Sequence, residues 1–512
     1  MPLDTTPILV GCGDVTDMTT PVEKGRSPFD LIAEAGRLAL ADTGAAGMAG
    51  RIDTVAMLRL FADTSHRFAT KLGTSTNPPK SIAKRLGIEA RRHLYTWNGG
   101  NMPQYLVNRF AEAISRGEMQ AAMVVGGEAL RTQHGVERRS LDDISWREDP
   151  GGEPELIGDP RRGWSDDEDR HNIRAAITLY PLIENAIRGQ RGASVPDHLK
   201  SMGKLFSGFA KVAAENPLAT RRDGFTAEQL ATVDGGNRWI GFPYPRLMNS
   251  NAFIDQSAAF IITSVGVARE LGIPEAKWVY LHGCADGHDH WFLSERPEIH
   301  VSHAIRNGSR KAFDMAGKTV GDMRFLDLYS CFPSAVEIGC KEMGIAEDDP
   351  RGLTVTGGLP YFGGPGNSYV VHSISEMIRR VRSEPGSFGL VTANGNYVTK
   401  HSFGIYSTTP TEGQWTREDP AVLQAELDAM PKVPYASEAS GPATIETYTV
   451  MHGRNGPEYG VVYGRLTATG QRFVANTPDD AATLNDLQDR DSLGRPGTVR
   501  RAEDGRNIFV PA

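Results

Sequence analysis

The order of secondary-structure patterns in this chain of 512 residues repeats itself. In the first half, a helix that stops at Gly44 precedes an apolar strand at Ile52–Leu58, and a helix that ends at Gly117 precedes the buried strand Ala121–Glu128. In the second half, the corresponding pairs are a helix at His303–Met315 with a strand at Arg324–Tyr329, and a helix ending before Pro385 with a strand at Phe388–Gly395. An internal repeat of this size governs the whole fold. Because strands and helices alternate in both copies, we predict an α/β protein with mostly parallel sheets covered by helices.

The chain is too long for one hydrophobic core, so we expect several domains. Residues 1–268 should form the first copy and residues 275–415 the second. Charged stretches between about 131 and 234 predict a surface excursion with helices of its own. Beyond a linker-like stretch, short alternating segments joined by glycine-rich turns predict a small β-barrel at 440–512, for which the OB-fold is a candidate.

Bulk properties exclude several classes of protein. The net charge is -8 and no run of Lys and Arg suggests a nucleic-acid face. No apolar run approaches membrane length, and the N-terminus lacks the features of a signal peptide. Four cysteines in such a length do not form a disulfide framework. We therefore expect a cytoplasmic protein that binds neither nucleic acid nor membranes.

Two chemically active side chains follow a predicted buried strand. The stretch Arg324–Phe332 (RFLDLYSCF) reads as a short strand and a turn, with a helix from about Ser334. The end of a strand just before a helix is a usual place for chemistry in an α/β protein, and here it carries Tyr329 and Cys331. A glycine-dense loop, Gly357–Ser368, follows about one helix later.

These stretches resemble the thiolase superfamily. Ala316–Phe332 is similar to the segment that ends in NEAF in ordinary thiolases and in HDCF in the sterol-carrier-protein type. The loop GGLPYFGGPG resembles the thiolase loop that contains GHP, and Asp255–Ala259 (DQSAA) resembles DGAAA. The C-terminal module resembles the extension of thiolase-like proteins of type 1, often named acetyl-CoA acetyltransferases. The resemblance implies a thiolase fold of duplicated βαβαβαββ halves in α-β-α-β-α layers, with an acyl-CoA as substrate or ligand.

The resemblance also assigns positions in the site. The nucleophilic Cys of thiolases begins the helix that here ends near Gly117, and counting back puts Gly100 at its position. The His of GHP falls on Gly364, the Asn or His of NEAF or HDCF falls on Tyr329, and the acid/base Cys of HDCF is matched by Cys331. Loss of a thiol at a helix N-terminus removes covalent acyl transfer at that position. The positions expected to bind the CoA thioester are Gly100, Asn101, Gly363, Gly364 and Asn394, with backbone amides of the glycine loop or groups near Asn394 holding its oxygen.

Three side chains are candidates for moving a proton. Cys331 could protonate or deprotonate a carbon next to a thioester carbonyl, or it is a small core residue. Tyr329 could donate to an enolate or abstract a proton, or it is a buried Tyr with one hydrogen-bond partner. His401 follows the late strand and is the best general base near neutral pH, unless it is structural. His93 and Tyr361 are weaker candidates.

Two further motifs carry residues typical of a metal site and of a nicotinamide site. His282–His290 (HGCADGHDH) is rich in metal-binding side chains, but its spacing matches no standard zinc signature. Gly11–Asp14 (GCGD) follows a strand as in nicotinamide enzymes, but the third glycine and the acidic partner are not convincing. We expect neither a metal nor a redox cofactor.

The leading hypothesis is therefore an acyltransferase-family protein that acts on C–C bonds next to a CoA thioester without the usual nucleophilic Cys. Some thiolase-like retro-aldolases, which carry a Tyr at the position of Tyr329, work beside a separate OB-fold partner, so retro-aldol cleavage stays open. The alternative is a catalytically silent protein that binds or scaffolds a CoA ester. The resemblance to type 1 proteins favours a monomer over a thiolase-type dimer.

Overall fold

The computed structural model describes residues 2–64 and 68–512. Within these residues, ten strands form one sheet in the order β10-β11-β12-β9-β1-β8-β4-β2-β3-β5. The first half supplies β1 (Pro7–Thr16), β2 (Thr54–Met57), β3 (Arg92–Thr96), β4 (Ala121–Ala129), β5 (Glu155–Ile157) and β8 (Asp255–Ser264). The second half supplies β9 (Val279–His288), β10 (Phe325–Asp327), β11 (Phe388–Gly395) and β12 (Lys400–Ser407).

The strand order confirms the internal duplication. The series β1-β8-β4-β2 in the first half is repeated as β9-β12-β11-β10 in the second. In both series the first two pairings are antiparallel and the third is parallel. The two series meet where β1 pairs with β9, with Ile8 opposite Tyr280. The sheet is thus mixed and not mostly parallel. One reason is that β11 and β12 form a hairpin, and a short connection can join only antiparallel neighbours.

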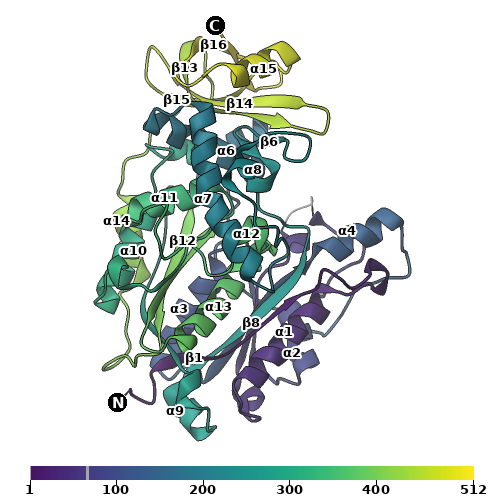
Figure 1. Cartoon of the computed structure of the whole chain (residues 1–512), viewed down its shortest axis with the longest axis vertical. Coiled ribbons are helices and arrows are strands. Elements are labelled where there is room, and N and C mark those ends of the chain that lie inside the picture. The colour runs from purple at the N-terminus through teal and green to yellow at the C-terminus, as the bar shows by residue number, and fades with distance from the viewer. Residues whose placement is uncertain (1, 65–67) are drawn as a thin grey trace.

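Helices complete the five layers that the thiolase resemblance implies. The outer layer of the first half contains α1 (Pro28–Asp42) and α2 (Pro78–Leu86), and that of the second half contains α10 (His303–Ala316) and α11 (Pro333–Met343). The central layer consists of α3 (Met102–Ser115) and α13 (Tyr369–Ser383), which contact each other and strands of both halves (Figure 1). Smaller helices are α9 (Val265–Glu270), α12 (Gly358–Tyr361) and α14 (Pro420–Asp428).

Local sequence explains how α1 lies on β1. Ser27 caps the helix, its hydroxyl accepting from the Asp30 N–H at 3.1 Å. The glycines of GCGD lie inside β1, and a Cβ at Gly11 or Gly13 would come within 2.3 Å of a carbonyl oxygen of α1. These glycines permit close helix–strand packing. They lie inside the strand and do not form the phosphate-binding turn on which the nicotinamide hypothesis rested.

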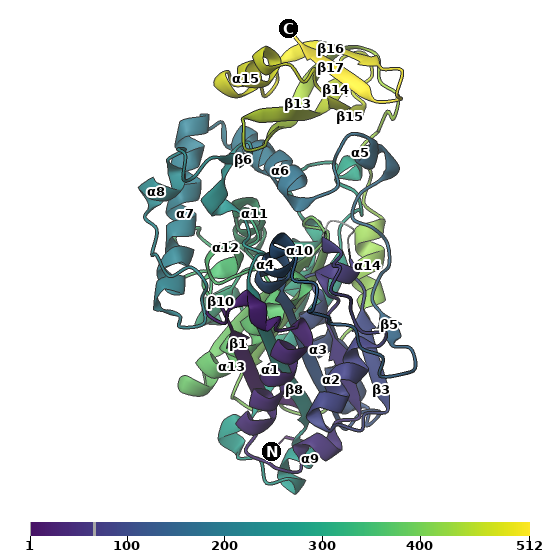
Figure 2. The ribbon, with the colours of Figure 1, turned by 90° about the vertical axis from the view of Figure 1, so that its right-hand side faces the viewer.

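Residues 131–234, predicted to be a surface excursion, are in part packed deeply between the thiolase halves and the C-terminal module. The excursion contains α4 (Leu130–Arg139), α5 (Asp166–Arg170), α6 (Ala176–Arg191), α7 (Val195–Glu215) and α8 (Ala227–Ala231), and the hairpin of β6 (Trp239–Gly241) and β7 (Tyr244–Pro245) follows it. Helix α6 contacts α11 on one side and the C-terminal module on the other (Figure 2). Its residues Tyr180, Leu182 and Ile183 are at most 1% exposed, because two neighbours cover most of its surface.

The C-terminal module is a closed barrel of β13 (Gly441–His452), β14 (Pro457–Leu466), β15 (Arg472–Asn476), β16 (Pro496–Arg501) and β17 (Asn507–Pro511), with α15 (Ala481–Asp489) between β15 and β16. The order β14-β15-β17-β16-β13 closes through the pairing of β13 with β14. This order, with a helix after the third strand, is the OB arrangement. Hairpin β6–β7 extends the barrel sheet beside β13. Among the described residues, no helix has the length and apolarity needed to cross a membrane.

Candidate active site

The N-terminus of α3 lies in the central layer and points to the second half. Gly99 donates its N–H to Oδ1 of Asn367, from the loop before α13, at 2.9 Å. Asn101 is the N-cap residue, and its buried Oδ1 has no hydrogen-bond partner. Free N–H groups and the helix dipole make such a helix end favourable for a developing negative charge. The structure therefore places Gly100 and Asn101 where an anionic group could be stabilised.

Gly100 is in direct contact with Tyr329. A Cβ atom at position 100 would lie 2.4 Å from the Tyr329 Oη and 2.6 Å from the Asn394 carbonyl oxygen. No real Cβ tolerates such distances, so the phenol of Tyr329 occupies the space that a nucleophile's side chain at position 100 would need. Three residues predicted separately, one from the first half and two from the second, thus meet in one place.

Cys331 joins this group through a residue that sequence reasoning missed. Tyr180, from α6 of the excursion, accepts a hydrogen bond from Asn394 Nδ2 at 2.9 Å, and its hydroxyl interacts with the Cys331 thiol. The Tyr180 ring stacks on Phe332 with centroids 4.5 Å apart. We name Gly100, Tyr180, Tyr329, Cys331 and Asn394 the tyrosine–cysteine cluster. It unites both halves and the excursion.

Burial keeps the proton-transfer candidates neutral. It raises the pKa of the Cys331 thiol to about 12 and raises the pKa of Tyr329 well above its ordinary value. Burial also lowers the pKa of His401 to about 4. The charged form of each group is disfavoured because it loses hydration. At neutral pH, Cys331 and Tyr329 are therefore proton donors, and His401 is a weak base.

His401 lies in strand β12 and faces a small cavity beside the cluster. Tyr329, Asn394 and His401 line this cavity, whose volume is about 20 Å³. The volume suffices for about one water molecule. The Nε2 of His401 and the Oδ1 of Asn394 are buried without a hydrogen-bond partner. Unpaired buried polar atoms are uncommon and indicate a place for water or ligand.

Gly363 and Gly364 of the loop Gly357–Ser368 contact other residues than those of the cluster. Gly364 donates its N–H to the Asn251 carbonyl at 2.8 Å, so this amide is not free for an oxyanion. A Cβ at Gly363 would come within 2.1 Å of Gln256 Oε1 on β8. Both glycines serve a close crossing between the two halves. The loop residue that reaches the N-terminus of α3 is Asn367.

Lys400 is a second residue that the sequence did not single out. Its ammonium donates to the Asn98 carbonyl, and a Cβ at Gly99 would lie 2.9 Å from its Nζ. Burial lowers the pKa of Lys400 to about 8. It is therefore the basic group beside this helix end whose pKa lies closest to neutrality. Its local sequence, a Lys in an apolar strand, carries no signal of this position.

The other candidates lie elsewhere. Tyr361 is fully buried against aromatic rings of the excursion, and its hydroxyl has no partner. His93 is on β3. Within His282–His290 the side chains separate: His282 contacts the Thr409 carbonyl, while Asp286 bonds to Asn108 and Arg417. The described residues of this stretch do not converge on one point.

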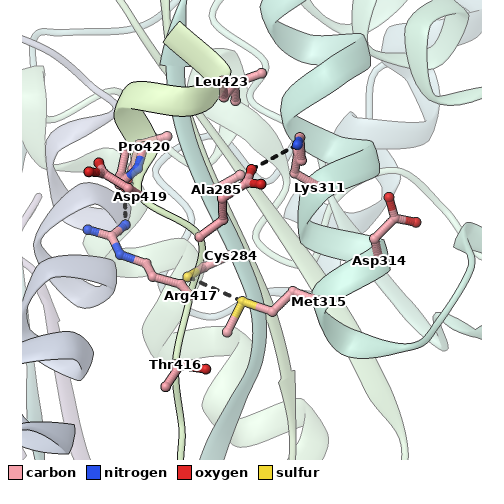
Figure 3. A pocket seen from close by; sticks show the side chains of 12 residues that line it. Cys284, Ala285, Lys311, Asp314, Met315, Thr416, Arg417, Asp419, Pro420 and Leu423 are labelled. Atoms are coloured by element: carbon pink, nitrogen blue, oxygen red, sulfur yellow. Dashed lines mark hydrogen bonds and ion pairs between the residues drawn. The ribbon is translucent and has the colours of Figure 1, made fainter. Parts of the chain in front are cut away.

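A larger cavity, of about 500 Å³, lies between β9, α10 and the segment that leads into α14 (Figure 3). Four of its charged groups form two ion pairs, Arg417 with Asp286 at 2.6 Å and Lys311 with Glu418 at 2.8 Å. It contains none of the predicted site residues. We therefore place the candidate active site at the tyrosine–cysteine cluster, even though its cavity is much smaller.

Comparisons with known proteins agree with this fold. A family model described as thiolase-like protein type 1 additional C-terminal domain matches residues 422–505. An acetyl-CoA acetyltransferase of Methanothermobacter thermautotrophicus is 25% identical over 189 residues, which are 34% of this chain. The match spans only 47% of that relative's length.

Two solved structures share the fold at low identity. An Ltp2–ChsH2(DUF35) aldolase has a TM-score of 0.57 at 20% identity, over 79% of this chain and 98% of that chain. An acetyl-CoA acetyltransferase from Syntrophomonas wolfei has a TM-score of 0.55 at 14% identity, over 79% of this chain and 99% of that chain. Together with the duplicated sheet, they define a thiolase-fold protein.

A third structure is much more similar. It is a monomeric SCP2-thiolase-like protein type 1 from Mycobacterium smegmatis, 37% identical with a TM-score of 0.85, and the match covers 100% of both chains. The chain belongs to the SCP2-thiolase-like proteins of type 1.

Proposed function

We propose that this protein binds an acyl-CoA or a related thioester at the N-terminus of α3. It acts there on the C–C bond next to the thioester carbonyl, without a covalent acyl intermediate. The observation that carries the proposal is the contact between Tyr329 and Gly100. The Tyr329 Oη would lie 2.4 Å from a Cβ at position 100. A phenol replaces the nucleophile while the helix end that stabilises negative charge is kept.

The neutral donors of the cluster fit cleavage of a β-hydroxyacyl thioester. A base takes the proton of the β-hydroxyl, the bond between the α- and β-carbons breaks, and its electron pair forms the thioester enolate. Tyr329 donates a hydrogen bond to the enolate oxygen, and Cys331 gives its proton to the α-carbon. The products are a carbonyl compound and a shorter thioester, and the hydroxyl proton restores the thiol. Lys400, with a pKa lowered to about 8, is our candidate base.

Binding is supported by atoms that lack partners. Asn101 Oδ1, Asn394 Oδ1 and His401 Nε2 are all buried without a hydrogen-bond partner, although His401 Nε2 lies 3.8 Å from Asp289 Oδ2. Polar groups of a ligand would satisfy these atoms. The residues proposed to contact the thioester are Gly100, Asn101 and Asn394. We retain Gly363 and Gly364 only as supports of the loop. No metal or redox cofactor enters the proposed reaction.

A silent CoA-ester-binding protein is the second candidate. It is favoured by the glycines at positions 100 and 364, which the thiolase resemblance aligns with the nucleophilic Cys and its activating His. Both candidates predict binding, and only turnover separates them.

The test is a titration with acetyl-, acetoacetyl- and β-hydroxyacyl-CoA that follows binding heat and, by mass spectrometry, products. We expect binding and cleavage of a β-hydroxyacyl ester. Cys331→Ala should abolish turnover and keep binding, whereas Cys340→Ala, a buried cysteine of α11 outside the cluster, should change neither. Binding without turnover would leave the silent protein as the function. Absence of binding to every ester would refute both candidates.

We also propose that the chain is a monomer, as the related protein from Mycobacterium smegmatis is. Light scattering behind a gel-filtration column should give a mass near the 55.7 kDa of one chain. A mass near twice that value would contradict the proposal.

A further inference from the structure

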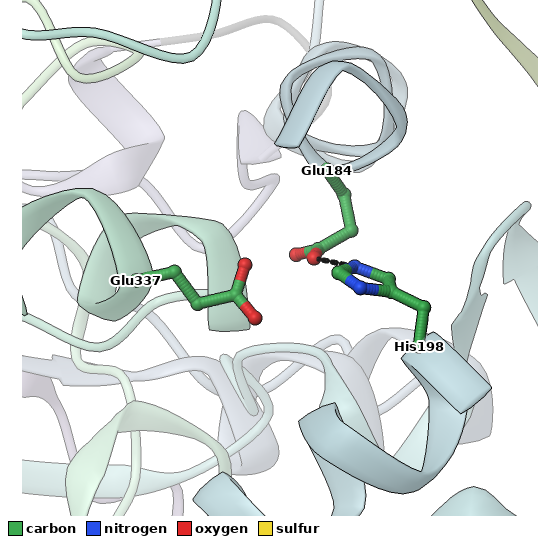
Figure 4. A group of neighbouring side chains, drawn as sticks. All are labelled: Glu184, His198 and Glu337. Carbon is green, nitrogen blue, oxygen red and sulfur yellow. Dashed lines mark hydrogen bonds and ion pairs between the residues drawn. The ribbon is translucent and has the colours of Figure 1, made fainter. Parts of the chain in front are cut away.

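Three ionisable side chains meet outside the tyrosine–cysteine cluster. Glu184 of α6, His198 of α7 and Glu337 of α11 point toward one another (Figure 4). Each offers one oxygen or nitrogen, and these atoms lie within 4.8 Å of one another. All three side chains are at most 1% exposed. Among the described residues this is the one such convergence of His, Cys, Asp or Glu.

Hydrogen bonds hold the outer atoms of the group. Tyr244 donates from its hydroxyl to Glu184 Oε2 at 2.5 Å, and Arg191 donates to Glu337 Oε1 at 3.1 Å. On the inner side, His198 Nε2 meets Glu184 Oε1 at 2.5 Å. Glu337 Oε2 and His198 Nδ1 have no hydrogen-bond partner. The outer oxygens are thus oriented by neighbours, whereas the inner atoms face one another.

Two inward-facing carboxyl groups in the interior require positive charge between them. Both carboxyl groups are fully buried, and the facing atoms of the three side chains lie within 4.8 Å of one another, so two bare carboxylates there would repel each other without hydration. Arg191 lies on the outer side of Glu337 and does not separate the two groups. Either a shared proton or a cation can fill this role.

We propose that Glu184, His198 and Glu337 form a binding site for a first-row transition dication such as Zn²⁺. Imidazole and carboxylate together suit these ions. Donors to the non-coordinating oxygens, such as Tyr244 and Arg191 here, are the usual outer contacts that fix metal ligands. Glu337 Oε2, a buried oxygen without a hydrogen-bond donor, supplies a ligand atom beside the Glu184 carboxyl.

The position of the site gives the ion a structural role. Tyr180 lies one helical turn before Glu184 on α6, and α11 begins at Pro333, shortly after Cys331. An ion held by α6, α7 and α11 would fix the excursion against the second half and hold Tyr180 over Cys331. The proposal does not depend on the reaction, since the ion would serve a silent binding protein equally well.

The experiment titrates chelator-treated, full-length protein with Zn²⁺ and measures bound metal by mass spectrometry after gel filtration. We expect one equivalent per chain and a higher melting temperature at about 100 µM free Zn²⁺. Glu337→Gln should weaken binding by about 100-fold, since it removes an anionic ligand. His290→Gln, a half-buried histidine of the stretch His282–His290, is the matched control and should bind as the wild type does.

Glu337→Gln should change metal binding without unfolding the protein. Its amide oxygen can still accept from Arg191, and its NH₂ can donate to Glu184, so folding should persist. If the group holds only a shared proton, the variant will melt at or above the wild-type temperature and Zn²⁺ will shift neither protein. That result would overturn the proposal. Equal Zn²⁺ binding by the wild type and Glu337→Gln would overturn it too, as would loss of Zn²⁺ binding in His290→Gln.

Discussion

At the scale of single residues, the identity of position 100 is coupled to that of position 329. Tyr329 can reach the N-terminus of α3 only because position 100 has no side chain, as the 2.4 Å approach to a Cβ shows. A chain with a nucleophile at 100 would have to move this phenol. A side chain at position 100 and the phenol of Tyr329 in its present place therefore exclude each other.

This coupling predicts the behaviour of Gly100→Ala. Overpacking in a buried site should lower the free energy of unfolding by about 1–3 kcal/mol. Adding Tyr329→Phe should restore part of the loss, because the Asn394 carbonyl at 2.6 Å remains. Urea unfolding of the single and double variants measures the coupling. Gly208→Ala is the control, since a Cβ there meets nothing within 4 Å. Additive effects of the two site substitutions would contradict the account.

His401 predicts how stability depends on pH. Its folded pKa of about 4 lies below the value of about 6.5 expected in the unfolded chain. Above pH 6.5 both states are neutral and stability is complete. As the pH falls toward 4, only the unfolded state binds a proton, so stability is lost, by about 2–4 kcal/mol in all. The groups that face His401 are Asp289, Arg296 and His288.

His401→Gln should remove this component. Urea midpoints at pH 7.5 and 4.5 should therefore lie closer together in His401→Gln than in the wild type. His290→Gln should keep the wild-type difference. If His401→Gln keeps it too, acid unfolding is governed by other groups.

The sequence allowed some site residues to be predicted and hid others for a physical reason. Gly100, Tyr329 and Cys331 belong to local motifs, so their positions could be inferred. Tyr180 bonds to Asn394 across 214 positions, and Lys400 reaches Asn98 across 302. Neither contact leaves a trace in nearby residues. His401 was expected to follow the strand Phe388–Gly395, whereas it lies within the next strand, β12. The burial that makes it a weak base was not anticipated either.

At the scale of elements, segments with a clear period could be predicted and polar ones could not. Strand β16 (Pro496–Arg501) exposes most of its side chains, and α15 buries only Leu484 and Leu487, so neither pattern stands out. The depth of α6 was underestimated because its charged flanks suggest a surface. The partners that bury it, α11 and the barrel, are more than 100 residues away in sequence.

Strand β15 anchors the barrel through Arg472. This side chain is fully buried and donates to Glu446 at 2.6 Å and to the Pro297 carbonyl at 3.0 Å. Arg472→Met should lower the free energy of unfolding by about 3–5 kcal/mol, as removal of one buried partner usually does. Arg465→Met is the matched control, because Arg465 pairs with the same Glu446 but is 31% exposed, and it should lose about 0–1 kcal/mol. Equal losses in urea unfolding would show that burial of Arg472 is not what matters.

At the scale of the whole molecule, the narrowness of the cluster raises the question of access. Tyr329 is only partly buried, but the cavity of about 20 Å³ beside it cannot hold a thioester. Helix α6 of the excursion packs on α11 and on the barrel. Its bonds to the barrel are from Arg188 to Asp491 at 3.0 Å and from Asn185 to the Tyr448 carbonyl at 2.8 Å. Ligand entry should therefore require α6 and α7 to move away from α11.

Asp491→Asn tests this movement, because it weakens the contact of α6 with the barrel. If opening precedes binding, the observed association rate of a CoA thioester should level off at high ligand concentration. The variant should raise that plateau by about 3- to 10-fold, since a loss of roughly 1 kcal/mol in a charge-assisted contact favours the open state by about that factor.

Amide exchange of α6 and α7 should rise in the variant and fall on ligand binding, while exchange of α1 and α2 stays constant. Asp504→Asn, which breaks an ion pair with Arg506 of the barrel and leaves the contacts of α6 intact, should leave the plateau unchanged. An association rate that rises linearly with concentration, with no change in the exchange of α6, would mean that the ligand enters by another route.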